Sequence, residues 1–316
     1  MNINKKILVC DKIEPEGIEL LKNAGFDLIE NPTITHEELI SMIKNVSVVI
    51  VRSRTKITKD VLNSAESLEL IGRPGTGVDN IDLSAATEKN IDVITSVEAS
   101  TNAVAELTIS LAVSLARSIP MADAALKNDL WLKNSLLGTE LRGKTFGIIG
   151  MGRIGRRTAQ LAIALEMNVI GFEKESIDNE FLMKYEIKQV EFEELLDKSD
   201  FVSLHLPSTP ETTHMMGRKQ FDMMKNSAYL INTARGQLII ESDLYQALVN
   251  NKIAGAALDV FSKEPPYGNK LIKLDNVIAT PHIGAQIVEA QKEASIVIAQ
   301  KIIKFFDDHK HDGLRN

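Results

Sequence analysis

The stretch GKTFGIIGMGRIGRRTAQLAIAL, residues 143–165, joins an apolar run, a glycine-rich turn and a helical pattern. Its glycines at 150, 152 and 155 have the spacing G-x-G-x-x-G, and residues 146–149 before them are apolar. A strand, this turn and then a helix form the context in which the spacing binds a dinucleotide. Gly150 would allow the tight turn, Gly152 the approach of a pyrophosphate, and Gly155 close packing of helix on strand. The stretch therefore predicts a parallel α/β unit with a dinucleotide site.

The residues around this turn extend the predicted cofactor site. The first turn of the expected helix offers the backbone N–H groups of Arg153 and Ile154 to phosphates. Glu173 ends the next apolar run, about 20 residues after the glycines, where the motif places an acid. A carboxylate there would bind the ribose hydroxyls of NAD and repel the 2′-phosphate of NADP, a preference that the neighbouring Lys174 weakens. The alternative is a solvated acid at the end of a strand.

Short apolar runs alternate with helical patterns along the chain, which predicts α/β units with parallel strands. The first series runs to about residue 98 and the second opens at 143. Strands are expected at 6–10, 46–51, 68–72, 168–173, 201–207, 228–234, 253–261 and 276–280. A helix is expected over 102–127, ended or bent at Pro120, and another over about 286–307.

The composition narrows the class of protein. A length of 316 residues suggests about two domains, and a net charge of −7 argues against a nucleic-acid partner. The single cysteine, Cys10, excludes an intrachain disulfide, and no histidine or cysteine spacing indicates a metal site. The N-terminus lacks a signal-peptide pattern, and the apolar run 107–116 is too short to span a bilayer. We therefore predict a cytoplasmic protein without a membrane partner.

Charged and polar side chains follow the predicted strands, at the sheet edge where open α/β folds bind ligands. They are Arg52, Ser53 and Arg54 after 46–51, Arg73 and Thr76 after 68–71, Arg235 after 228–232, Glu264 after 253–261, and His282 after 276–279. Arg235 could bind the carboxylate of a 2-keto acid and polarise its carbonyl, which His282 would protonate. A nearby Glu264 would raise the pKa of His282 and fix its tautomer. The arginines of the first series suit a phosphate.

Each of these residues also has a less specific interpretation. His282 alone is more often a loop histidine with an ordinary hydrogen bond, and Arg52 and Arg54 alone are more often solvated. Asp259 could cap the end of its strand, although we expect it to contact the cofactor near the nicotinamide. His205 also ends a strand, but no matching acid follows it.

Six stretches together resemble the D-isomer-specific 2-hydroxyacid dehydrogenase family over essentially the whole chain. They are VRSRTKIT (51–58), GRPGTGVDNIDLSAA (72–86), GTELRGKTFGIIGMGRIGR (138–156), NTARGQLI (232–239), GAALDVFSKEPP (255–266) and TPHIGA (280–285). The resemblance implies two Rossmann-like or flavodoxin-like parallel-sheet domains with a cleft between them. Residues 1–98 with 286–316 would bind the substrate, and residues 99–285 would bind NAD.

The resemblance also implies roles for single residues. Arg235, Glu264 and His282 would be catalytic, as the strand ends already suggest. The implied cofactor contacts are Thr76, Gly150, Gly152, Arg153, Ile154, Gly155, Glu173, Leu206, Thr233, Ala234, Asp259, Gly284 and Ala285. A homodimer would form through residues 102–130, and Lys133 would reach the substrate phosphate across it.

Within the family, the chain is most similar to the branch that oxidises D-3-phosphoglycerate to 3-phosphohydroxypyruvate with NAD, in serine biosynthesis. Since the chain ends about where the family's catalytic core ends, we expect no C-terminal regulatory domain. One alternative is a hydroxypyruvate or glyoxylate reductase of the same family, which would not need Arg54 and Arg73. An alternative from another class is an NAD-responsive, corepressor-like binding protein.

Overall fold

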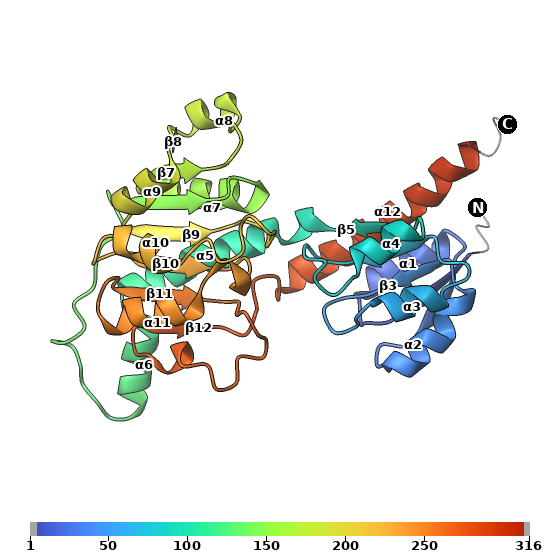
Figure 1. Ribbon diagram of the computed structural model, residues 1–316, viewed down its shortest axis with the longest axis horizontal. Coiled ribbons are helices and arrows are strands. Elements are labelled where there is room, and N and C mark those ends of the chain that lie inside the picture. Colours follow the sequence, from blue (N-terminus) through green and yellow to red (C-terminus); the bar gives the residue numbers. More distant parts are fainter. Residues whose placement is uncertain (1–4, 313–316) are drawn as a thin grey trace. The chain divides into compact units, whose positions relative to one another are not determined.

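The computed structural model describes residues 5–312, with side chains through residue 308, and divides the chain into two compact units. One unit joins residues 1–100 to residues 285–316, and the other holds residues 101–284. Each is a parallel sheet with helices on both faces (Figure 1). The outermost residues of the predicted substrate domain, 1–4 and 313–316, lie outside the described part of the chain.

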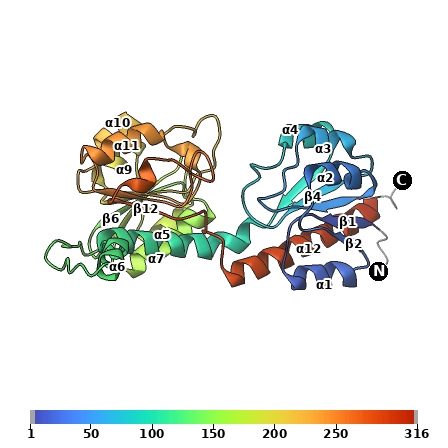
Figure 2. The same cartoon turned by 90° about the horizontal axis from the view of Figure 1, so that it is seen from below.

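The described part of the first unit has five parallel strands in the order β2-β1-β3-β4-β5. Its elements are β1 (Lys6–Val9), α1 (Pro15–Asn23), β2 (Asp27–Glu30), α2 (His36–Met42), η1 (Ile43–Asn45), β3 (Val48–Ile50), α3 (Lys59–Ser64), β4 (Leu70–Arg73), α4 (Leu83–Glu88), β5 (Asp92–Thr95), η2 (Val97–Ser100) and α12 (Val288–Asp312). Helices α1 and α12 cover one face of the sheet, and α2, α3 and α4 cover the other (Figure 2). The order changes direction between β1 and β3, a position where such sheets bind ligands.

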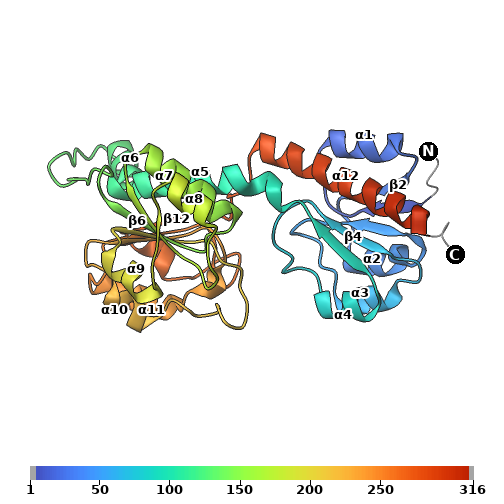
Figure 3. The ribbon, with the colours of Figure 1, turned by 90° about the horizontal axis from the view of Figure 1, so that it is seen from above.

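The second unit has seven parallel strands in the order β12-β11-β10-β9-β6-β7-β8. Its elements are α5 (Thr101–Ala116), α6 (Ile119–Lys127), β6 (Thr145–Ile149), α7 (Arg153–Ala164), β7 (Asn168–Phe172), α8 (Asn179–Lys184), β8 (Lys188–Gln189), α9 (Phe192–Lys198), β9 (Phe201–Leu204), α10 (Arg218–Met223), β10 (Tyr229–Asn232), η3 (Gly236–Leu238), α11 (Glu241–Val249), β11 (Gly255–Leu258), η4 (Leu271–Lys273) and β12 (Val277–Ala279). Helices α5, α6 and α7 lie on one face and α9, α10 and α11 on the other (Figure 3). The order changes direction between β6 and β9, which places the glycine-rich turn at the usual ligand-binding edge.

The predicted architecture of two parallel α/β domains is confirmed, and the differences concern single elements. The helix expected over 102–127 is two helices, because Ser118 adopts a left-handed backbone with φ 48° and α6 starts anew at Ile119. Pro120 stands in the first turn of α6, where its missing N–H has no helical partner to lose. Strand β2 escaped prediction because its residues are exposed or half-buried and form no buried apolar run.

The helical stretch Val97–Ala116 is long and apolar enough, by length and composition, to cross a membrane. It is longer than the apolar run 107–116 because the less apolar residues before that run continue the helix. More than half of it, 56%, is buried inside the structure. Since α5 packs against α7, β10 and β11, its apolar side chains have protein partners, as in the core helix of an α/β domain.

Helix α12 lies far from α1 in the sequence, but it packs against α1 and so completes the first unit. The contact is tightest at Gly17, because a Cβ atom there would lie 2.5 Å from the carbonyl oxygen of Ser295. The Ser295 hydroxyl also accepts a hydrogen bond of 2.8 Å from the backbone N–H of Glu14. A glycine in a helix usually costs stability, but here it allows two helices to touch at their backbones.

We expect Gly17→Ala to destabilise the protein, although alanine is the better helix former. The clash with a backbone carbonyl cannot be relieved by turning a side chain, and overpacking of this kind costs about 1–3 kcal/mol. Thermal unfolding of the variant should show a lower midpoint. Glu19→Ala, on the exposed side of the same helix, serves as the control and should leave the midpoint nearly unchanged. An unchanged midpoint in Gly17→Ala would contradict the close approach.

Candidate active site

The glycine-rich turn between β6 and α7 has the geometry that its spacing predicts. Gly150 has φ 97°, and a Cβ atom there would lie 2.8 Å from the backbone of His205. A Cβ atom on Gly155 would lie 2.0 Å from the carbonyl oxygen of Gly150, so helix and turn can pack only with glycine there. At Gly152 a Cβ atom would meet nothing within 4 Å, which leaves open space over the turn. Arg153 and Ile154 begin α7 beside that space, where helix N–H groups favour an anion.

Glu173 follows β7 and lies beside the same turn. One oxygen of its carboxylate accepts a hydrogen bond of 2.9 Å from the N–H of Met151, and the other accepts one of 3.3 Å from the N–H of Lys174. Arg156 donates to the carbonyl of Met151 at 3.0 Å. The carboxylate thus stands where the motif places it and also supports the backbone of the turn.

The loops after β9 and β10 hold further predicted cofactor contacts. Leu206 lies against the glycine turn, since a Cβ atom on Gly150 would come within 2.9 Å of it. Thr233 is buried, and its hydroxyl is 2.9 Å from that of Thr108 in α5. The carbonyl of Ala234 accepts a hydrogen bond of 2.6 Å from the guanidinium of Arg235.

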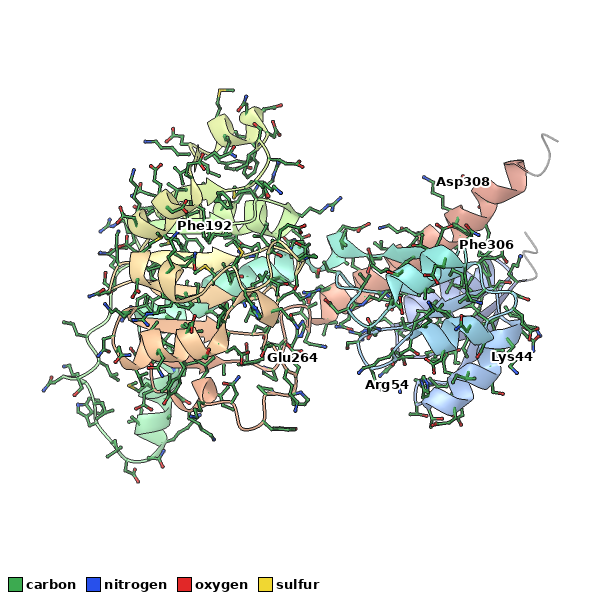
Figure 4. All side chains as sticks on the ribbon, in the orientation of Figure 1. Lys44, Arg54, Phe192, Glu264, Phe306 and Asp308 are labelled. Carbon is green, nitrogen blue, oxygen red and sulfur yellow. The ribbon has the colours of Figure 1, made fainter. Side chains whose placement is uncertain are left out.

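His282 and Glu264 form the hydrogen-bonded pair that the sequence predicts, with 2.8 Å between Nδ1 and Oε2. Glu264 (labelled in Figure 4) comes from the loop after β11, and His282 comes from the loop after β12. The second carboxylate oxygen of Glu264 accepts a hydrogen bond of 3.1 Å from the N–H of Phe261. With Nδ1 facing the carboxylate, Nε2 is the imidazole nitrogen left to act on a ligand.

The electrostatics of the pair match acid/base chemistry. The hydrogen bond to Glu264 raises the pKa of His282, whereas burial lowers it. The charges of Glu264 and Asp259 raise this pKa further. The pKa of Glu264 is lowered, because its contacts with His282 and the Phe261 N–H outweigh the opposing effect of burial. Arg235 lies close enough to affect both groups: its charge lowers the pKa of each. The structure therefore brings Arg235, Glu264 and His282 together.

Arg235 reaches this position because Gly236 lets two loops touch. A Cβ atom on Gly236 would lie 1.9 Å from the carbonyl carbon of Phe261, inside the backbone of the loop that carries Glu264. No side chain can occupy that space, so the residue after Arg235 has to be glycine. The loops that carry Arg235 and Glu264 are thus held together by a backbone contact.

Asp259 anchors the loop that carries His282. Its side chain is fully buried, and Oδ1 accepts hydrogen bonds from the Thr280 hydroxyl at 2.6 Å and the Ile283 N–H at 2.8 Å. Oδ2 accepts one of 2.9 Å from the N–H of Gly284. In this structure Asp259 therefore caps the end of its strand, which was the alternative that the sequence left open. The charge of Asp259 also raises the pKa of His282.

The backbone of His282 is itself unusual, with φ 54° in the left-handed region that favours glycine. Its N–H donates to the carbonyl of Asp259 at 2.9 Å, which helps to hold that conformation. His205, the other histidine at a strand end, differs in its pKa and in its hydrogen-bond partner. Burial lowers its pKa to about 3, and its Nε2 lies 3.0 Å from the hydroxyl of Ser203. A neutral imidazole is poorly suited to deliver a proton.

The predicted phosphate ligands of the first unit have structural partners of their own. Arg54 (labelled in Figure 4) pairs with Asp11 at 2.9 Å, and it donates to the carbonyls of Cys10 and Ile34. The pKa of Arg52 is lowered by burial, and its guanidinium lies 3.4 Å from the carbonyl of Lys12.

The other predicted residues have local contacts or are exposed. Arg73 lies against Gly75, where a Cβ atom would be 2.1 Å from its guanidinium. Thr76 meets the hydroxyl of Ser100 at 2.7 Å, and Ala285 belongs to the same unit. Ser53 is exposed. Lys133 is exposed in the segment after α6, which in Figure 4 lies on the side of its unit away from Glu264.

Asp11 is a functional candidate that sequence reasoning missed. It is buried directly after β1, and its carboxylate accepts hydrogen bonds from the Arg52 N–H and the Thr55 hydroxyl, at 2.5 and 3.0 Å, as well as binding Arg54. Asn80 braces the same loop by donating to the carbonyls of Arg52 and Thr55. The strand-end rule would have singled out Asp11 had it been applied to the first strand.

The fold and the site define a nucleotide-dependent oxidoreductase, and comparison with known proteins identifies the family. The chain belongs to the D-isomer specific 2-hydroxyacid dehydrogenases: the NAD binding domain of that family matches residues 109–284. NAD is accordingly the cofactor of this domain. All of the matched residues lie in the second unit, with the glycine turn, Arg235, Glu264 and His282 among them.

Individual relatives refine the comparison. The chain is 48% identical to the D-3-phosphoglycerate dehydrogenase of Methanocaldococcus jannaschii over 95% of its own length and 57% of that protein. It therefore spans little more than half of this relative. It is 40% identical to the hydroxypyruvate reductase of Thermotoga maritima, over 95% of this chain and 97% of that one. Among solved structures, a glyoxylate reductase from Paecilomyes thermophila matches with a TM-score of 0.88 at 30% identity, over 96% of this chain and 95% of the other.

We expect Glu264→Gln to move the titration of His282 to lower pH. The substitution removes the carboxylate that raises the pKa of His282 and leaves burial and Arg235, which lower it. NMR titration of the histidine ring would show the shift, with His282→Gln used to assign the resonance among the six histidines. Glu193→Gln, an equal charge change on an exposed residue of α9, should leave the titration unchanged. A His282 midpoint that stays in place would contradict the coupling.

The same pKa shifts fix the pH window in which the pair adds stability. A lowered pKa on Glu264 means that its contribution is lost as pH falls through that pKa, and a raised pKa on His282 means that it is lost as pH rises through that one. The ion pair therefore stabilises the fold between the two values.

Proposed function

We propose that the chain oxidises D-3-phosphoglycerate to 3-phosphohydroxypyruvate with NAD, as a cytoplasmic enzyme of serine biosynthesis. The observation that carries the chemistry is the 2.8 Å contact of His282 with Glu264, with Arg235 close enough to act on both. The substrate follows from the similarity to a D-3-phosphoglycerate dehydrogenase.

The residues fit this reaction as follows. NAD supplies the acceptor for the hydride that leaves C2 of the substrate. Nε2 of His282 takes the proton of the C2 hydroxyl, so that a carbonyl forms at C2 and the imidazole becomes charged. Glu264 stabilises that charge through Nδ1. Arg235 binds the substrate carboxylate and the C2 oxygen, and in the reverse direction it polarises the carbonyl.

The cofactor contacts form a second part of the proposal. The turn at Gly150, Gly152 and Gly155 would receive the pyrophosphate, because the space over Gly152 is open and α7 begins there. Glu173 would bind the adenosine ribose. The remaining contacts proposed are Arg153, Ile154, Leu206, Thr233, Ala234, Asp259 and Gly284 in the second unit, with Thr76 and Ala285 in the first. The first unit would serve as the substrate-binding domain.

Arg52, Ser53, Arg54 and Arg73 are the proposed phosphate ligands. Arg52 is the best suited for a direct contact, because the hydrogen bond from its guanidinium to the carbonyl of Lys12 is long, at 3.4 Å. Arg54 would contribute less, since Asp11 and two carbonyls already engage its guanidinium.

A second candidate function is the reduction of hydroxypyruvate or glyoxylate. The observation in its favour is the engagement of Arg54 by Asp11, which reduces the charge available to a phosphate. The similarity to a hydroxypyruvate reductase over 97% of that protein agrees with it. The acid/base chemistry of Arg235, Glu264 and His282 would be the same for both functions.

Comparison of two substrates decides between the candidates. We expect the purified protein to oxidise NADH with a kcat/KM for 3-phosphohydroxypyruvate about a hundredfold above that for hydroxypyruvate, since charge-assisted hydrogen bonds contribute ~1.5–3 kcal/mol each. Arg52→Gln should reduce this preference roughly tenfold while the hydroxypyruvate value stays constant. Arg142→Gln, which removes an exposed arginine elsewhere, is the control. Equal values for both substrates in the unaltered protein would favour the reductase.

We also propose that the chain forms a homodimer through α6 and the segment after it. This part of the described chain exposes Ile119, Leu126, Leu130, Trp131 and Leu137, with Trp131 77% and Leu137 96% accessible. Clustered apolar side chains of this kind usually mark a protein interface. Lys133 belongs to the same segment, so a dimer would bring it to a partner.

We expect Trp131→Glu to shift the protein toward monomers, because a charge in an apolar interface loses its hydration. Analytical ultracentrifugation of the variant at micromolar concentration would measure the change. Met183→Glu provides the control, because Met183 is similarly exposed, at 75%, but lies in α8. A monomeric unaltered protein, or a dimer that survives Trp131→Glu, would refute the proposed interface.

A further inference from the structure

We propose that Glu241 is a positioning residue for the acid/base pair, because its carboxylate closes the loop that carries Glu264. This inference rests on the proposed dehydrogenase chemistry. It concerns the loop between β11 and η4, in which Glu264 lies and in which residues 262–270 form neither helix nor strand.

Most of the loop is exposed to solvent. Ser262, Lys263 and Glu264 are exposed, and Tyr267 is 89% accessible. An open pocket of about 460 Å³ is lined by residues of the loop and of α11, Tyr245 among them. Because this space is not filled by side chains, packing alone does not fix the path of the backbone around Glu264.

Glu241, the first residue of α11, ties the two ends of the loop to one carboxylate. One oxygen accepts a hydrogen bond of 2.7 Å from the N–H of Ser262, and the other accepts one of 2.8 Å from the side-chain amide of Asn269. The carbonyl of that amide in turn accepts from the N–H of Leu271 at 3.0 Å, where η4 begins. Glu264 lies two residues after Ser262, inside the closed segment.

The arrangement requires a carboxylate. Both oxygens of Glu241 face donors, and the Asn269 amide cannot be reversed without losing its bond to Leu271. A glutamine at 241 could accept from one donor but would present its own N–H₂ group to the other. Such a substitution therefore opens one end of the loop while it preserves size and polarity.

The placement of Glu241 along the chain strengthens the inference. It lies at the end of the connection that begins with Arg235, and Gly236 in that connection touches the backbone of Phe261. The segments that carry Arg235 and Glu264 are thus joined by the Gly236 contact, by a long hydrogen bond of 3.5 Å from the Gln237 amide to the Ser262 carbonyl, and by Glu241. Loss of the Glu241 contact would leave the Gly236 contact and loosen the part nearer to Glu264.

An acid in the first turn of a helix stabilises that helix in general, and this effect must be distinguished from the contact of Glu241 with the loop. Glu241 and Asp243 both stand in the first turn of α11, where acids are favourable. Asp243 differs in its partner, because its carboxylate accepts from the N–H of Arg218 in α10 at 3.0 Å. Asp243→Asn therefore removes a similar charge and a similar hydrogen bond without touching the loop.

The test compares Glu241→Gln, Glu241→Asp and Asp243→Asn in the reduction of the preferred substrate. We expect both Glu241 variants to lower kcat roughly tenfold to a hundredfold, as misplaced catalytic groups do, with NADH affinity unchanged. Reduction requires protonated His282, so the alkaline limb of the kcat profile should move to lower pH as contact with Glu264 weakens. Asp243→Asn should keep the unaltered kcat and pH profile. Should Glu241→Gln fail to fold, Glu241→Asp tests the same contact, because it keeps the charge and shortens the side chain.

A double substitution distinguishes failure of this inference from failure of the proposed function. If Glu241 acts through Glu264, Glu241→Gln should cost little more in a Glu264→Gln background than that variant costs alone. Full additivity, or an unchanged kcat in both Glu241 variants, would overturn the positioning role. A Glu264→Gln variant with normal turnover and pH profile would instead overturn the acid/base pair on which the proposal rests.

Discussion

A buried carboxylate needs hydrogen-bond donors, and at Asp259 this need determines the geometry of the active site. An ionised group without water is costly unless neighbouring donors replace it. The loop after β12 supplies those donors from Thr280, Ile283 and Gly284, and to do so it must wrap around the carboxylate. His282 lies within that wrapped segment and accepts a left-handed backbone as a result. The position of the imidazole is therefore set by the hydrogen bonds that Asp259 accepts from the loop around it.

The site is assembled from loops that meet because parallel strands end at one edge. Arg235, Glu264 and His282 follow β10, β11 and β12, which are neighbours in the sheet. Because all parallel strands end at the same edge of the sheet, the residues that follow them could be named as site candidates from the sequence alone. The glycine turn was equally accessible, since Gly150 and Gly155 are each required by a close backbone approach. Both cases depend on local pattern combined with a general rule of α/β folds.

Other features depend on contacts that the sequence does not encode locally. Glu241 meets Ser262 and Asn269 across more than twenty residues, and no motif marks it as different from Asp243 two positions later. Arg54 was expected to be available to a ligand, yet its guanidinium is held by Asp11 after another strand. Whether a charged side chain is already engaged is a property of the folded neighbourhood. The sequence could therefore indicate which residues gather, and the structure was needed to say which of them support the others.

The return of α12 to the first unit bears on how the chain is made. Strands β1 to β5 and helices α1 to α4 precede the second unit in the sequence, but α12, which covers one face of their sheet together with α1, follows it. The second unit is continuous in sequence and can fold as soon as its own strands have emerged. Until α12 arrives, Ile7, Val48 and Leu70 lack part of the apolar cluster that buries them. Of these two units, the one that is translated first is thus completed after the other.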